Sequence, residues 1–418
     1  MKPITTKDNH MKRSRFLLGS LSGLTVAANL DGFFARALAA PALPNLPGGV
    51  DERVLVVINL QGGNDGLNTL VPHGLPQYYA LRPTIGVPKN DVLRIDDAVG
   101  LNPAMTALKT LYDKGQVAIV QGAGYPNPDH SHFRSTEIWQ TAVPDAYAST
   151  GWLGRYLDAA NLPADNLFNA VAVSPVLPEA LIAERVDVPA IDALRGYGLA
   201  SDHNTYERGA FAAFVKDDTR VPFTSPYLPV VATIEDHAER GAAELPKLVA
   251  GYKTEATYPA TQLGRSLALA AQIIGSRLGT RVLYVQHGSF DTHVSQKATQ
   301  DRLLRELSDG LAAFYADLAA HGNDRRTLTM TFSEFGRRVA ENANRGTDHG
   351  EAAPMFLLGG GVKGGLYGTH PSFDRLDNGD VTFTTDFRSV YATVIEKWFA
   401  RSSGGVIAGT FPTVPLLA

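Results

Sequence analysis

The sequence predicts an α/β protein with three layers, in which helices cover both faces of a mainly parallel sheet. The first observation is the apolar, valine-rich run at 54–60, which is typical of a strand buried on both faces. The second is a helical pattern followed by another apolar run at 116–121, since strand, helix, strand in this order predicts a parallel crossover unit. The third is the return of the same alternation between residues 262 and 332.

Composition limits the classes of function. The chain has 418 residues, 44% of them hydrophobic, so it can bury one large core. A net charge of −4 gives no basic footprint, so we expect no nucleic-acid partner. There is no cysteine, which excludes disulfides and thiolate metal sites. A metal ion would therefore need oxygen and imidazole ligands.

The first 39 residues have the features of an export signal. Lys12, Arg13 and Arg15 precede a weakly apolar stretch, and Ala37–Ala39 offers a small-residue cleavage site. We interpret 1–39 as a twin-arginine-like signal and 40–52 as a linker. This predicts the twin-arginine translocase as a partner and a periplasmic or secreted protein. A Sec signal or an uncleaved anchor is the alternative. We find no other apolar run long enough to span a bilayer, and expect no transmembrane domain in the mature chain.

The remaining elements follow in order within a single domain at 53–418. Asn102 and Pro103 have the residue types of a helix cap and first helical position. The region at about 161–257 has little periodicity, and we interpret it as a cap insertion that covers the site. The other expected elements are a strand at 116–121, helices beginning near 131 and at 151–160, a helix at 262–278, a strand at 281–285, a helix at 300–320, strands at 327–332 and 354–358, and a helix at 386–399.

Acidic residues follow three of the predicted strands. They are Asp65, Asp291 and Glu334, and His293 and His349 lie close to the second and third of them. The carboxyl ends of parallel strands meet at one edge of a sheet, so we expect these side chains to converge there. Carboxylates and imidazoles together are ligands for divalent ions: zinc, manganese, magnesium or calcium, one or two of them. Singly, each acid could equally be a helix cap or a solvated turn.

The order of these motifs resembles a known family. The segments LQGGNDGLN, SHF, FDTH, SEFGRR, GTDHG and VKGGLYG resemble a bacterial family of unknown function, number 1501. That family lies within the alkaline phosphatase superfamily, which includes phosphatases, sulfatases and cofactor-independent phosphoglycerate mutases. The resemblance covers about residues 53–398 and implies an alkaline-phosphatase-like fold.

The resemblance also implies a role for each strand-end residue. Asp65 matches the first-strand metal ligand, and Asp291 with His293 matches one metal subsite. Glu334 falls where an aspartate is usual. The other matches are Phe335, where a metal-binding histidine is usual, His349 as the later histidine, and Asp348 beside it as an extra ligand or an orienting group. The phenylalanine removes one expected nitrogen ligand, which leaves a one-metal, oxygen-rich site or a degenerate site.

For catalysis, the resemblance places Ser131 at the nucleophile position, with Ser135 as the fallback. Arg134 and Arg337 are candidates for a bidentate clamp on an anion, or else ordinary surface arginines. His132 could orient Ser131 or point to solvent, and we expect the latter because adjacent helix residues do not share a face.

The implied function is an exported, metal-dependent hydrolase of phosphate or sulfate esters, acting on an anionic small-molecule or polymer ester. The alternative is a non-catalytic member that binds an anionic ligand or a component of the cell envelope.

Overall fold

The computed structural model describes residues 52–163, 166–193, 241 and 245–418. The predicted export signal, all of the linker except its last residue, and most of the predicted cap insertion lie outside these residues and stay predictions. Within the described residues, no helix is both long and apolar enough to cross a membrane.

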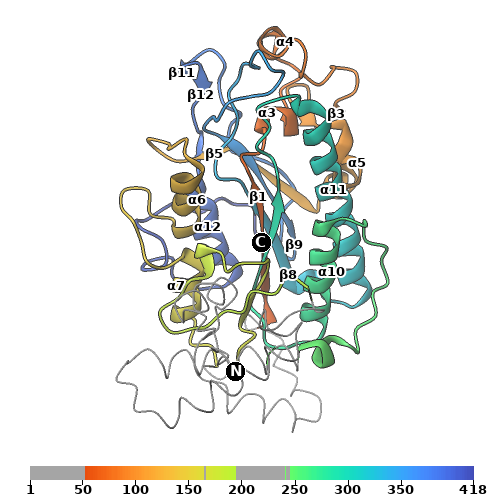
Figure 1. The fold of residues 1–418 in the computed structure, drawn as a ribbon, viewed down its shortest axis with the longest axis vertical. Coiled ribbons are helices and arrows are strands. Elements are labelled where there is room, and N and C mark those ends of the chain that lie inside the picture. The colour runs from red at the N-terminus through yellow and green to blue at the C-terminus, as the bar shows by residue number, and fades with distance from the viewer. Residues whose placement is uncertain (1–51, 164–165, 194–240, 242–244) are drawn as a thin grey trace, which may run out of the picture.

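One large sheet forms the centre of the protein (Figure 1). Its strands are β1 (Val54–Gln61), β5 (Val117–Gly124), β6 (Ala170–Val173), β7 (Val282–Gly288), β8 (Thr327–Phe332), β9 (Ala353–Gly359), β10 (Gly365–Tyr367) and β13 (Thr385–Asp386). The order is β10-β5-β9-β8-β1-β7-β6, and β13 also pairs with β5. All pairings are parallel except those of β9 with β5 and β8. The predicted three-layer, mainly parallel α/β fold is confirmed.

Helices cover both faces of this sheet (Figure 1). On one side lie α5 (Thr106–Asp113), α10 (Gln262–Gly275) and α11 (Gln296–Ala320); on the other lie α6 (His132–Thr141), α7 (Trp152–Ala159) and α12 (Phe387–Thr393), which continues as the π-helical turn η7 (Val394–Trp398). Alternate side chains of β1 point to opposite faces of the sheet. Val56 and Ile58 belong to the core under the first set of helices, whereas Leu55 and Val57 belong to the core under the second. This is why the β1 segment reads as an unbroken apolar run.

Short elements complete the described fold. They are the helices α3 (Gly66–Thr69) and α4 (Pro76–Leu81), the 3-10 turns η3 (Pro103–Met105), η4 (Glu179–Leu181) and η6 (Asp324–Arg326), and the strands β2 (Leu70–Val71), β3 (Leu93–Arg94), β4 (Gly100–Leu101), β11 (Leu376–Asp377) and β12 (Asp380–Val381). Within the predicted insertion at about 161–257, β6 belongs to the central sheet as the neighbour of β7, and the rest of the insertion stays a prediction.

The turn after β1 brings two strand ends together. Gly62 and Gly63 have φ values of +108° and +78°, which side chains rarely adopt. A Cβ on Gly62 would lie only 2.5 Å from the backbone nitrogen of Asp291. The two glycines therefore let the β1 turn pack directly against the segment that follows β7, at the carboxyl edge of the sheet.

Candidate metal centre

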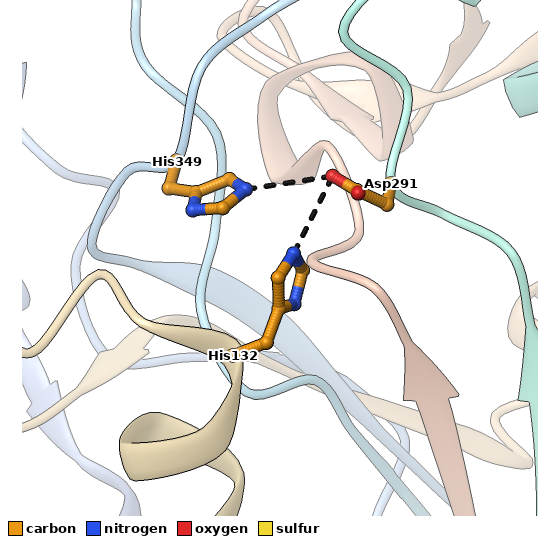
Figure 2. Close-up of side chains that lie close together, drawn as sticks. All are labelled: His132, Asp291 and His349. Atoms are coloured by element: carbon orange, nitrogen blue, oxygen red, sulfur yellow. Dashed lines mark hydrogen bonds and ion pairs between the residues drawn. The ribbon is translucent and has the colours of Figure 1, made fainter.

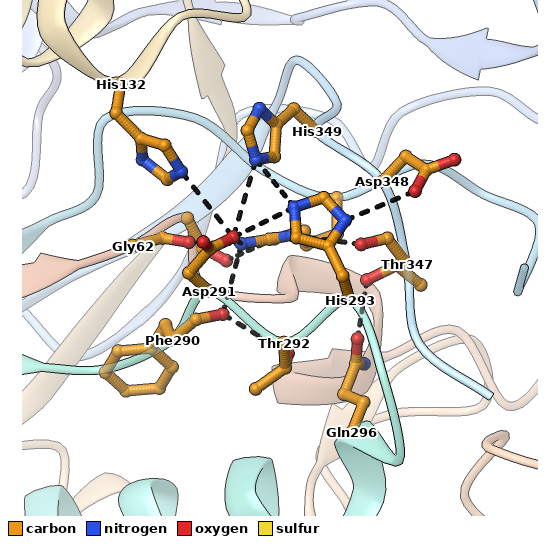
Figure 3. Close-up of polar contacts among 12 residues, drawn as sticks. Gly62, His132, Phe290, Asp291, Thr292, His293, Gln296, Thr347, Asp348 and His349 are labelled. Carbon is orange, nitrogen blue, oxygen red and sulfur yellow. Dashed lines mark hydrogen bonds and ion pairs between the residues drawn. The ribbon is translucent and has the colours of Figure 1, made fainter. Parts of the chain in front are cut away.

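Asp291, just after β7, lies at the centre of a group of histidines from three separate segments (Figures 2 and 3). Its Oδ1 is 3.5 Å from His132 Nε2, at the start of α6. The same oxygen is 3.0 Å from His293 Nε2 and 3.4 Å from His349 Nε2, in the loop before β9. Of the acids predicted to converge, Asp291 is thus the one that meets both predicted histidines.

The spacing of these atoms suits one metal ion. Donor atoms of His132, Asp291 and His349 all lie within 4.8 Å of one another. His293 Nε2 adds a nitrogen 2.9 Å from His349 Nε2. Ligands of a tetrahedral zinc ion, at about 2.0–2.1 Å from it, are about 3.3 Å apart. Among the described residues this is the one group of three or more histidine and carboxylate donors with such spacing.

Each of the three imidazole rings also makes a contact through Nδ1, the nitrogen on the other side of the ring from Nε2. The carboxylates of Glu334 and Asp348 and the backbone carbonyl of His130 can accept from these Nδ1 atoms, and a proton on Nδ1 would leave Nε2 free to bind a metal ion. This outer support is the arrangement usual around metal-binding histidines. The contacts are His132 Nδ1 to Glu334 Oε1 at 3.1 Å, His293 Nδ1 to Asp348 Oδ1 at 3.3 Å, and His349 Nδ1 to the His130 carbonyl at 2.7 Å.

The contact between the Nε2 atoms of His293 and His349 needs a proton or a metal ion. The two Nε2 atoms are 2.9 Å apart, and both would be unprotonated if each ring carried its proton on Nδ1. Two such lone pairs repel unless a proton or a metal ion lies between or beside them. The donor set present, imidazole nitrogens and one carboxylate, therefore fits a divalent ion.

The centre is open to solvent. The side chains of His132, Asp291, His293 and His349 are between 21% and 46% exposed. Structural zinc sites are closed by four protein ligands, whereas catalytic sites keep a position for water or substrate. This exposure leaves access for a small anionic ligand.

The surroundings shift the pKa values of the donors. Burial raises the pKa of Asp291, but the Arg337 hydrogen bond and charge, with the charges of His132 and His293, hold the pKa of that carboxyl below its usual value. The hydrogen bond to Glu334 raises the pKa of His132. Asp291 is thus ionised at neutral pH, as a metal ligand must be.

Arg337 does not have the free guanidinium that an anion clamp needs. Its side chain is fully buried, and Nη2 donates to Asp291 Oδ1 at 2.7 Å. The other acceptors are backbone carbonyls: Gly63 at 2.8 Å, Thr347 at 2.9 Å, Phe290 at 3.2 Å and Gly62. Arg337 Nη1 also lies 3.5 Å from His293 Nε2, so each nitrogen of the guanidinium has a contact within the protein. In the structure, Arg337 holds Asp291 in place and links the loops around the centre.

Asp65, predicted as a metal ligand, is used elsewhere. Its Oδ1 accepts from the backbone nitrogens of Leu67 and Asn68, both at 3.2 Å, and so caps α3. Its Oδ2 accepts from Arg82 Nη1 at 2.7 Å in a fully buried ion pair, and also from Gln296. The structure therefore places Asp65 in a helix cap and an ion pair, not in the histidine group.

The other predicted site residues are placed as follows. Glu334 is buried and contacts His132, so it lies behind the centre, and exposed Asp348 lies behind His293. Arg134 is paired with Glu137 and donates to two backbone carbonyls of the loop after α6. These contacts engage the guanidinium within the protein, and the use of Arg134 as an anion clamp stays a prediction.

The two candidate nucleophiles differ in availability. Ser131 is the exposed N-cap residue of α6, and its side chain makes no capping hydrogen bond. Ser135 is buried, and its hydroxyl contacts both the Glu334 carbonyl and, at 3.0 Å, the Tyr125 hydroxyl. No contact of the described residues links the Ser131 hydroxyl to Asp291 or to the histidines.

His132 is the site residue that the sequence reasoning missed, and its expected solvent-facing orientation is wrong. The ring is half-buried and lies 4.5 Å, centroid to centroid, from His349. From the sequence, His132 is expected only as a partner of Ser131 or as a ring that points to solvent. The available signal was its position as the first helical residue, where a side chain can turn back toward the strand ends.

A pair of acids behind His349 predicts a pH effect on stability. Asp380 Oδ2 accepts from the Glu351 backbone nitrogen at 2.9 Å. Burial raises the pKa of Asp380 to about 6, and burial together with the Asp380 charge raises the pKa of Glu351 to about 7. Both acids thus hold protons more tightly in the folded state, so their contribution to stability falls as pH rises from about 4 to about 7. In metal-free protein we expect Glu351→Gln to raise the melting temperature progressively more as pH increases from 5 to 8.

Glu341→Gln provides the opposite-sign control. Although burial raises the pKa of Glu341, hydrogen bonds from Thr84 and Ile85 lower it overall. Its ionised form is therefore favoured by folding, and its replacement should cost more stability as pH rises. Thermal unfolding followed by circular dichroism measures both series. A Glu351→Gln effect that stays constant across this pH range would show that the two acids do not titrate as described.

One described cavity lies away from the centre. It has a volume of about 690 Å³ and lies between α5, α11 and the end of β9, with Leu111, Tyr315 and Leu358 among its lining residues. Leu358 pairs with Val117, the first residue of β5, so the cavity is at the amino edge of the parallel strands. No histidine lines it, and we assign it no part in the chemistry of the metal centre.

Comparisons with known proteins give one family and several distant structures. A family model described as a protein of unknown function (DUF1501) matches residues 52–399. No curated protein sequence matches the chain. Similar solved structures include a protein in the alkaline phosphatase superfamily from Vibrio parahaemolyticus, at 10% identity, covering 83% of this chain and 66% of that one, with a TM-score of 0.36. A sulfatase from Pseudoalteromonas sp. matches at 12% identity, covering 88% and 72%, with a TM-score of 0.37. A C-terminal periplasmic domain from Escherichia coli, in complex with zinc, matches at 9% identity, covering 74% and 72%, with a TM-score of 0.35.

Proposed function

We propose that this chain, which belongs to the DUF1501 family, holds one divalent metal ion and hydrolyses phosphate or sulfate esters. The observation that carries the proposal is the convergence of three histidine Nε2 atoms on Asp291 Oδ1, each ring held by an acceptor at its Nδ1. The order of the sequence motifs, which resembles that of phosphatases and sulfatases, supports the reaction class.

The donor set favours zinc or a similar transition metal. Imidazole suits zinc and its neighbours, whereas magnesium and calcium prefer all-oxygen sites. Asp65, the first-strand acid, is engaged by Arg82, so the ligands that we assign are Asp291, His132, His293 and His349. The ester would take a fifth position on the exposed side of the centre. One ion, not two, follows from this assignment.

The protein's own groups would bind and orient an anionic ester. The exposed faces of His293 and Asp291 leave room for the ester beside the centre. When bound, zinc supplies Lewis acidity toward an ester oxygen and makes a hydroxyl or water more acidic. Ser131, at the positive end of α6, presents an exposed hydroxyl whose Oγ would bond to phosphorus or sulfur as the ester P–O or S–O bond breaks, and the leaving alcohol would take up the serine proton. Water would then cleave the Ser131 ester and release phosphate or sulfate. Asp291 stays ionised through its contact with Arg337.

If Ser131 is the nucleophile, its replacement should abolish turnover without weakening zinc binding. Ser131→Ala should abolish hydrolysis of aryl phosphates and aryl sulfates by the zinc-loaded protein, because the bond to Oγ forms only during the reaction. Zinc affinity should stay within about twofold of wild type, since no described contact ties this hydroxyl to the ligands. Activity is measured by release of nitrophenol, and affinity by competition with a chromophoric chelator.

Thr136→Ala is the matched control, because it removes a half-buried hydroxyl on the same helix and should leave turnover unchanged. Full activity of the Ser131 variant would reject the serine. If zinc-bound wild type cleaves neither class of ester, the binding-protein alternative replaces the hydrolase. The commitment of Arg134 and Arg337 to internal acceptors is the observation that favours that alternative, since it leaves an anion without those clamps.

We also propose that the protein acts in the periplasm or outside the cell. The basic residues before the Phe16–Leu18 segment support passage through the twin-arginine translocase. That route carries folded proteins, so the metal centre would be assembled before export. Immunoblotting of periplasmic and cytoplasmic fractions tests the location.

A further inference from the structure

Phe335 creates a gap in the expected ligand set. It follows Glu334 after β8, where the resemblance implies a metal-binding histidine, and it offers no donor atom. Its buried ring lies against the two imidazoles that do belong to the centre. The ring centroids are 4.9 Å from His132 and 4.5 Å from His349. The phenylalanine thus forms an apolar wall of the centre.

The missing nitrogen is present, but it comes from another element. His132 belongs to the first turn of α6, about two hundred residues before Phe335 in the sequence. Its Nε2 reaches Asp291 Oδ1 at 3.5 Å, and its Nδ1 reaches Glu334 Oε1 at 3.1 Å. A helix residue, His132, and a strand-end residue, Glu334, are therefore in contact beside Asp291.

Burial and hydrogen bonds hold the Glu334 side chain in place. It is 1% exposed, and its Oε1 also accepts from the Gly62 backbone nitrogen at 2.7 Å. Its own backbone carbonyl accepts from the Ser135 hydroxyl, one turn along α6 from His132. Glu334 thus joins the β1 turn, the end of β8 and the start of α6. The position of His132 relative to Asp291 depends on these contacts.

We propose that Glu334 is a positioning residue, which orients His132 so that its Nε2 supplies the metal ligand that Phe335 cannot. This inference rests on the proposed metal centre and deepens it. A carboxylate that accepts from Nδ1 fixes the tautomer and the ring orientation and makes Nε2 a stronger donor. Glu334 is therefore not itself a ligand, because its Oε1 faces His132 and Gly62.

The test is the zinc affinity of Glu334→Gln in two backgrounds. The amide keeps the shape and the acceptor but removes the charge. We expect zinc to bind about 10- to 100-fold more weakly, the usual loss when such a supporting partner of a ligand is changed. In a His132→Ala background, Glu334→Gln should change zinc affinity by less than about twofold, because the ring through which it acts is gone. Zinc affinity is measured by competition with a chromophoric chelator.

Asp348→Asn is the matched control. Asp348 supports His293 in the same way, but its side chain is 61% exposed and its contact is 3.3 Å, so its loss should weaken zinc binding less and equally in both backgrounds. If Glu334→Gln fails to fold, Glu334→Asp, which withdraws the carboxylate by one methylene, should weaken zinc binding in the same direction. Undiminished affinity in the Glu334 variant, or an equal loss in both backgrounds, would overturn the inference. Absence of zinc binding by wild type would instead overturn the metal centre on which it rests.

Discussion

Replacing His349 with alanine is expected to remove stoichiometric zinc from the protein. The ring is one of three whose Nε2 atoms converge on Asp291, and its Nδ1 is already held by the His130 carbonyl. Loss of a direct ligand should weaken affinity by more than the 10- to 100-fold typical of an outer partner, that is by over about 100-fold. Asp291→Ala should have an effect of the same size, because this carboxylate contacts all three rings. Metal analysis after gel filtration, with chelator competition, measures both.

His130→Ala is the control for this prediction. Its side chain is exposed, whereas the group that supports His349 is its backbone carbonyl, which alanine retains. Zinc affinity should therefore match wild type. Wild-type zinc content in both His349→Ala and Asp291→Ala would show that the ligand assignment is wrong.

Replacing Arg82 with methionine is expected to lower the free energy of unfolding by about 3–5 kcal/mol. That is the usual loss when one partner of a buried ion pair is removed and the other charge stays buried. Both side chains of the Arg82–Asp65 pair are fully buried. The guanidinium also donates to the Val339 and Arg338 carbonyls, at 2.8 Å each, so α4 is tied to the loop that leads to the metal centre. Urea denaturation followed by circular dichroism gives the free energy.

Arg302→Met is the matched control, because Arg302 is 55% exposed and pairs with Glu306 on the same helix. An exposed pair of this kind is worth under about 1 kcal/mol. If Arg82→Met destabilises the protein no more than Arg302→Met does, then Asp65 is not held as a buried charge by Arg82, and its exclusion from the metal centre loses its physical reason.

The sequence predicted the order of the main elements well because periodicity is a local property. The runs at 54–60, 116–121 and 327–332 correspond to β1, β5 and β8, and Ser131 precedes α6 as expected. The family match at 52–399 confirms the resemblance drawn from the motifs. The reversed direction of β9 was not predicted, since strand direction depends on which neighbours the chain meets.

The site was predicted only in part. That Asp291, His293 and His349 would meet followed from the rule that parallel strand ends share an edge, and the structure brings these three together. The same rule placed Asp65 and Glu334 near that edge, but it says nothing about which partner each carboxylate takes. In the structure Arg82 donates to Asp65 and His132 contacts Glu334.

Residue types and their spacing along the chain thus determined the α/β architecture, the absence of thiolate ligands and the candidate edge. Only the tertiary structure decided which side chains form the centre. A buried charge or imidazole pairs with whatever complementary group lies within about 3 Å, and that group can be hundreds of residues away in sequence. His132 shows this most clearly: its ring meets Glu334 and Asp291 because α6 packs against the strand ends, a contact that no local pattern encodes.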